Sequence, residues 1–119
     1  MHLLQIRSAQ MDAFREERRR VVAAEVGENI RTRWPSRLAL PSQPINDCVA
    51  LSLEWSERRR ATDRLTLEAV AAVFAAYGPP PWTAPFARPL ADIHLEPAER
   101  VQRFVDAAVR ALDEEEAAR

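Results

Sequence analysis

Apolar side chains recur at helical spacing over the first third of the chain. Ser8 is a good helix N-cap and Asp12 suits the positive end of a helix dipole, so we expect a helix from about Ser8. Its end is expected at Trp34, because the residue before Pro35 is pushed out of the helical region. Arg18 interrupts the stripe, which indicates that part of this face is open or paired. The stripe consists of Met11, Phe14, Val21, Val22, Val26 and Ile30.

A second helix is expected after a stiff connection, residues 35–44, that holds three prolines. Asn46 or Asp47 can cap this helix, which should run to about Arg59. Its expected inner face consists of Cys48, Val49, Ser52 and Trp55.

The third helix has the clearest pattern. We expect Thr66 to cap it, Glu68 to stand in its first turn, and Gly78 to end it in the C′ position, with Pro79 blocking continuation. The apolar positions are Leu67, Val70, Ala71, Phe74 and Tyr77.

Five prolines between residues 79 and 89 exclude a regular helix or a central strand. This segment is expected to wrap the bundle, with Trp82 and Phe86 as its anchors. For Trp82, as for Trp34, two interpretations remain open: the ring caps the core, or it forms a binding hot spot. A partner site is expected first at Trp82 and Phe86, because a proline-rich aromatic loop has little entropy left to lose on binding. A short helical turn is expected around residues 90–93.

The last helix is expected to begin at Glu96 and Pro97, since proline at the first helical position favours a helix start. The acidic run over residues 113–116 is unfavourable at the negative end of a helix dipole, so residues 113–119 are expected to fray. The apolar stripe consists of Val101, Phe104, Val105, Ala108 and Leu112.

These elements predict an all-α protein, a compact bundle of about four main helices with proline-rich connections in a single domain over residues 1–119. Composition agrees, with 21 alanines and two glycines among 119 residues.

The formal net charge is -1, and all 17 basic residues are arginines. This balance does not favour nucleic-acid binding. No apolar run approaches the roughly 20 residues of a membrane span and the N-terminus does not resemble a signal peptide, so we expect a cytoplasmic protein without membrane contact.

Candidate chemistry for catalysis is sparse. Cys48 is the single cysteine and lies on an apolar stripe, which favours a buried structural role. His2 and His94 match no zinc spacing, and no glycine-rich phosphate loop exists. Paired carboxylates stand among solvent-type residues, whereas acid catalysis needs a desolvated one. We therefore expect no enzyme, and no cofactor or metal.

Two arginine runs are the most visible charged features. Local acids predict the ion pairs Glu16–Arg20 and Glu54–Arg58, as on solvated helix faces. A protein-binding patch and a nucleic-acid contact are the two other interpretations, and the former is preferred. The partner-binding candidates are Trp82, Phe86, Arg58, Arg59, Arg60, Arg18, Arg19 and Arg20.

Short motifs in a recognisable order cover nearly the whole chain. They are I-x-x-x-Q-M-x-A-F at Ile6, Gln10, Met11, Ala13 and Phe14, the junction Trp34-Pro35, the helix end Tyr77-Gly78-Pro79, then Pro81-Trp82, and Pro97 with Arg100. This order resembles the small helical proteins encoded beside type VI secretion spike and effector genes in proteobacteria. Two departures stand out: Arg60-Ala61 where a tyrosine-glycine pair is usual, and three prolines in place of an acidic turn after Gly78.

The resemblance implies a non-enzymatic adaptor or chaperone that binds an effector or spike component encoded nearby. An immunity protein that occludes a toxin is the alternative. A helix-turn-helix-like DNA-binding regulator, using the second and third helices, and a purely structural dimer are two further hypotheses. Salt-sensitive DNA binding would mark the regulator, and self-association would mark the dimer.

Overall fold

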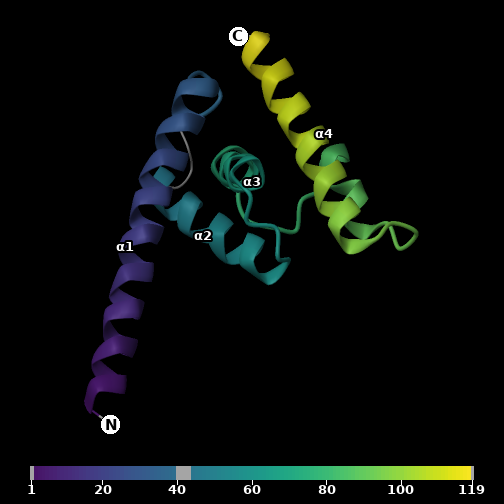
Figure 1. Cartoon of the computed structure of the whole chain (residues 1–119). Helices are drawn as coiled ribbons and strands as arrows, with labels where there is room; N and C mark the ends of the chain where they lie inside the picture. Colours follow the sequence, from purple (N-terminus) through teal and green to yellow (C-terminus); the bar gives the residue numbers. More distant parts are fainter. Residues whose placement is uncertain (1, 40–43, 119) are drawn as a thin grey trace.

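Helices account for the regular structure of the described part of the chain, residues 2–39 and 44–118 of a computed structural model. The predicted all-α class is confirmed, and a short 3-10 helix joins the four main helices (Figure 1). The proline-rich connection over residues 35–44 lies partly outside the described residues. The elements are α1 (His2–Arg33), α2 (Ile45–Arg58), α3 (Arg64–Tyr77), the 3-10 helix η1 (Pro85–Ala91) and α4 (Pro97–Ala117).

The central element is α3, which lies between α1 and α4 and packs against α1, α2 and α4 (Figure 1). Most of its residues are small or apolar, so neighbouring helices approach it closely from several sides. The inner face predicted for α2 is buried against α3, and the inner face predicted for α4 is buried against α3 and η1. Within α3 the buried residues are Thr66, Leu67, Ala69, Val70, Ala71, Ala72, Val73, Phe74 and Ala75.

Only the C-terminal part of α1 joins this core. Val26 and Ile30 are fully buried, whereas Met11, Phe14 and Val21 of the same predicted stripe are exposed. The stripe is therefore right in its spacing and wrong in its predicted burial, because no other described element covers the first half of the helix. The expected start at Ser8 is also wrong: the helix begins at His2, and its backbone hydrogen bonds continue through the serine.

Two predicted helix caps are corrected. Pro44, rather than Asn46 or Asp47, precedes α2. Asp63 caps α3, and its carboxylate accepts hydrogen bonds from the backbone N–H (3.2 Å) and hydroxyl (2.8 Å) of Thr66. A carboxylate ahead of the helix serves both donors, which lets the threonine enter the helix and become buried.

Three predicted boundaries in and around the proline-rich region fare differently. The helical turn expected at residues 90–93 is met only in part, by η1, which starts earlier, at Pro85, and ends at Ala91. Proline is tolerated there because the first turn of a helix leaves its N–H groups without intrahelical partners. The end of α3 is as predicted, at Gly78 with φ 83°. The start of α4 is also as predicted, with Glu96 before Pro97.

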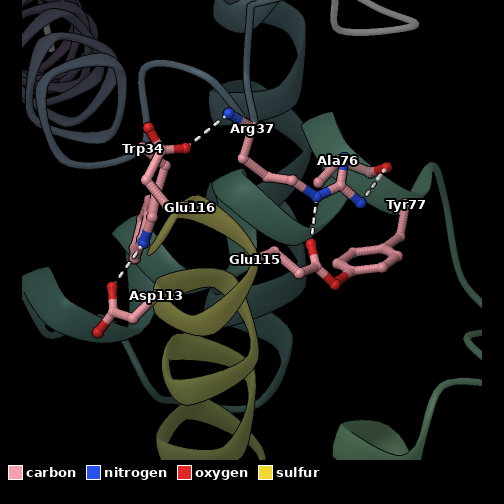
Figure 2. A network of polar contacts seen from close by, with 7 residues as sticks. All are labelled: Trp34, Arg37, Ala76, Tyr77, Asp113, Glu115 and Glu116. Atoms are coloured by element: carbon pink, nitrogen blue, oxygen red, sulfur yellow. Dashed lines mark hydrogen bonds and ion pairs between the residues drawn. The ribbon is translucent and has the colours of Figure 1, made fainter. Parts of the chain in front are cut away.

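The acidic C-terminal run is ordered rather than frayed, because α4 continues to Ala117. Trp34 Nε1 donates to Asp113 Oδ1 at 2.7 Å. The backbone N–H groups of Ser36 and Arg37 donate to the two carboxylate oxygens of Glu116 at 2.8 and 2.7 Å. Figure 2 shows the bond from Arg37. These donors follow the end of α1, and they outweigh the unfavourable helix dipole that predicted fraying.

A second part of this network joins Glu115 to two side chains. Both the Arg37 guanidinium and the Tyr77 hydroxyl donate to its carboxylate (Figure 2). Burial alone would lower the pKa of Arg37, but hydrogen bonds to Glu115 and Tyr77 outweigh it and the pKa is raised. Burial, followed by the Glu115 hydrogen bond, raises the pKa of Tyr77. We call residues 34–37, Tyr77 and residues 113–116 the tail clamp.

Candidate functional site

The second arginine run lines an open hollow where the end of α2 faces the start of α4. The hollow has a volume of about 410 Å³. None of the described residues that line it carries a carboxylate, and the four guanidinium groups that gather there include one, that of Arg58, with an ion-pair partner outside the lining. We call it the arginine pocket; it is lined by Arg58, Arg59, Arg60, Arg100, Leu90, Pro97 and Val101.

Arg60 occupies this pocket in an unusual backbone conformation. Its φ of 54° lies in the left-handed region, where an L-residue other than glycine costs roughly 1 kcal/mol. The N–H groups of Arg60 and Ala61 donate to the carbonyls of Glu57 and Ser56 at 3.1 and 3.0 Å, the pairing of a Schellman helix end. Glycine is the usual residue at this position, so an arginine here points to a use for its side chain.

Two other arginines of the pocket are held by backbone carbonyls. The Arg59 guanidinium lies 3.9 Å from the Trp55 ring centre and donates to the Trp55 carbonyl at 3.2 Å. Burial of the Arg59 guanidinium, together with the charge of Arg58, lowers the pKa of Arg59. Arg100 Nε donates to the Leu95 carbonyl at 2.9 Å. Each of these bonds uses one N–H donor of a guanidinium group and orients the donors that remain.

The predicted ion pair between Glu54 and Arg58 is confirmed, at 2.6 Å. Both side chains are largely exposed, and such pairs contribute between zero and about 1 kcal/mol. Arg58 therefore remains able to exchange this carboxylate for a stronger acceptor.

The two aromatic candidates of the proline-rich segment are placed inside the fold. Phe86 is buried, which rules it out as an exposed partner-binding residue. Trp82 is half-buried; its ring stacks on Phe104 with centroids 5.3 Å apart, and its indole N–H donates to the Gly78 carbonyl at 2.9 Å. Trp82 therefore caps the core, as one of the two interpretations predicted, and Phe86 is itself a core residue.

The first arginine run lies on the exposed surface of α1 and does not join the pocket. Arg19 pairs with Glu57 of α2 at 2.8 Å, and within the described part of the chain Arg20 forms no ion pair with Glu16. That predicted pair is therefore wrong. The acids Glu54 and Glu57 lie beside Arg19 and Arg20 and separate the two runs.

Arg18 belongs to a different surface, which we call the projecting segment, residues 10–18 of α1. Every side chain in it is exposed, and this half of α1 extends away from the other helices (Figure 1). Met11 is 58% and Phe14 69% exposed, values far above those of core residues. The two side chains lie one turn apart and, with Gln10, Arg15 and Arg18, line a shallow hollow of about 510 Å³.

Sequence reasoning missed the contribution of Arg100, Leu90, Pro97 and Val101 to the arginine pocket. They lie about 30 to 40 residues from the arginine run, and no local spacing links the two segments. A partial signal was the Arg60-Ala61 pair at a helix end, where glycine is favoured.

Other candidate chemistry is structural in the described residues. Cys48 is fully buried as predicted, and burial followed by the charge of Asp47 raises the pKa of its thiol. No group of three or more His, Cys, Asp or Glu residues in the described part is arranged to hold a metal ion. Among the helices described, none has the length and apolarity to cross a membrane.

Comparison with known proteins adds no relative: no family model matches the chain, and no curated protein or solved structure matches it either. The resemblance to proteins of type VI secretion loci therefore remains a prediction. The two surfaces of the chain that bear on its function are the arginine pocket and the projecting segment.

Proposed function

We propose that this chain is a non-enzymatic accessory protein that binds another protein, with the projecting segment as its main contact surface. The observation that carries the proposal is the exposure of Met11 and Phe14 on a helix that leaves the core. Large apolar side chains gathered on an exposed surface are typical of interaction sites.

The shape and charge of this surface favour a helical segment of the partner. A single helix offers a narrow apolar stripe, and another amphipathic helix is the element that covers such a stripe along its length. Arg15 and Arg18 line the same hollow as the stripe, which suits a partner helix that carries acidic side chains beside its apolar face.

Following the resemblance in the sequence, we propose that the partner is an effector or spike component of a type VI secretion system. The chain would hold or load it in the cytoplasm of the producing cell, as an adaptor or chaperone. The near-neutral charge supports a protein partner over nucleic acid.

The test is co-expression of the chain with the products of the genes that flank its own, followed by pull-down and sizing. We expect a stable complex with one of these products. The double substitution Met11→Gln with Phe14→Gln should weaken it about 100-fold, because each apolar side chain contributes roughly 1.5 kcal/mol when buried. The unfolding midpoint of the free chain should not change, since both side chains are exposed.

The matched control is Asp12→Gln with Glu16→Gln, on the opposite face of the same exposed turns. It should retain the complex. Equal loss in both double variants, or no complex with any flanking product, would overturn the proposal. A self-dimer that only the Met11→Gln, Phe14→Gln variant loses would also overturn it, in favour of a structural dimer.

Given a complex, a partner that is toxic without the chain and harmless with it indicates immunity, whereas a partner that needs the chain for solubility indicates a chaperone.

A further inference from the structure

The arginine pocket is a second surface that the projecting segment does not explain. The four guanidinium groups repel one another. The one carboxylate that α2 supplies to them is that of Glu54, which forms an exposed ion pair with Arg58. Such a cluster is stabilised by an anion, and planar guanidinium groups match carboxylate oxygens bidentately.

Arg60 gives the independent reason to regard this pocket as a binding site. Its left-handed backbone would be less strained with glycine, and no ion pair or hydrogen bond of its described side chain compensates for that strain. Arg59 and Arg100 are each oriented by a backbone carbonyl. The pocket is therefore organised before a ligand arrives, which lowers the entropy lost on binding.

The remaining lining residues indicate which kind of anion fits. Leu90, Pro97 and Val101 place an apolar surface beside the charges. A hollow of about 410 Å³ is in the range that holds an organic ligand. Among the described lining residues none offers an aromatic ring for base stacking, and Arg59 covers the nearby Trp55 ring, which disfavours single-stranded nucleic acid.

We propose that the arginine pocket binds an acidic peptide segment of a partner protein, with carboxylates on Arg58, Arg60 and Arg100 and an apolar side chain against Leu90 and Val101. The inference deepens the proposed function, since it rests on a protein partner and names the chemistry of a second contact. Its test needs only the isolated chain, so it can succeed or fail independently of partner capture.

The experiment measures fluorescence anisotropy with a fluorescein-labelled, amidated peptide of sequence Glu-Asp-Leu-Asp-Glu. We expect saturable binding that weakens with salt and is absent for the Gln-Asn-Leu-Asn-Gln peptide. Arg60→Gly should weaken binding about tenfold or more, the loss of one charge-assisted contact. The same variant should raise the unfolding midpoint, because glycine suits the left-handed position, so weaker binding cannot result from misfolding.

Arg31→Gln is the matched control, because it removes one exposed arginine of α1 outside the pocket, and it should bind the peptide like the unchanged chain. The Met11→Gln, Phe14→Gln variant should also retain peptide binding. Absence of peptide binding, or equal affinity in Arg60→Gly, would overturn the proposal. So would displacement by inorganic phosphate at concentrations no higher than the peptide's own, which indicates a free-anion site. Tighter binding of a labelled 12-nucleotide DNA strand would assign the pocket to nucleic acid and overturn it as well.

Discussion

At the scale of single residues, the side chains of greatest interest are those whose surroundings conflict with their ordinary preference. Arg60 takes a backbone conformation that glycine prefers, and Tyr77 places its hydroxyl against a carboxylate that would repel a tyrosinate. The first conflict stands at an open pocket and the second inside the tail clamp. Because Arg60 lines an open pocket, it is suited to binding, whereas Tyr77 lies inside the tail clamp and stabilises the fold.

Tyr77 makes stability depend on alkaline pH. Its pKa is raised above the ordinary 10.0, so the folded chain keeps a proton that the unfolded chain loses. Its contribution is fully present below pH 10 and is lost as pH rises through the folded pKa. We expect the free energy of unfolding, measured by urea titration, to fall as the pH rises above 10. Tyr77→Phe should lose about 1 kcal/mol at pH 8 and show a weaker fall above pH 10.

This pH dependence can be isolated because few other groups titrate in the same range. The chain has one tyrosine and no lysine. The pKa of Cys48 is also raised, from 9.0, so its contribution falls in the same direction as pH rises. Cys48→Ala separates the two groups. If Tyr77→Phe and the unchanged chain have the same slope above pH 10, the hydroxyl does not face the Glu115 carboxylate.

At the scale of elements, periodicity predicted the helices and their inner faces, and it failed where partners come from distant segments. The stripes of α2 and α4 match the buried positions, since each face is set by spacing within one helix. In α3 the buried positions extend beyond the predicted stripe to Ala69, Ala72, Val73 and Ala75, because helices pack on it from several sides. The tail clamp was missed because the dipole argument considered α4 alone, whereas the donors to Glu116 follow α1. The arginine pocket was missed in the same way, since η1 and α4 supply half of its lining.

Neighbouring glutamates of α4 test the tail clamp. Glu116→Ala leaves the backbone N–H groups of Ser36 and Arg37 without their acceptor, so we expect a loss of about 1–3 kcal/mol in the free energy of unfolding. Glu114→Ala is the control: its side chain is exposed, and its effect should stay within about 0.5 kcal/mol. Chemical denaturation followed by tryptophan fluorescence measures both. If both substitutions had equally small effects on the free energy of unfolding, the tail would be frayed, as the helix dipole predicts.

At the scale of the whole molecule, one helix belongs to two environments. The C-terminal part of α1 packs Val26 and Ile30 into the core, while residues 10–18 have only their own helical hydrogen bonds and solvent. Isolated helices of such length are marginal in water, because most helical stability comes from tertiary packing. The projecting segment should therefore open locally far more often than the rest of the fold.

Native-state hydrogen exchange measures this difference directly. We expect amides of residues 10–18 to exchange with little protection, and those of residues 26–33 and of α3 to approach the protection set by global unfolding. A bound partner helix should raise protection in residues 10–18 and leave α3 unchanged, because ordering the segment is part of the binding reaction. Strong protection of residues 10–18 in the free, monomeric chain would contradict this, since it requires a packing surface that the fold does not supply. The same protection appearing only at high protein concentration would identify a second copy of the chain as the element that covers Met11 and Phe14.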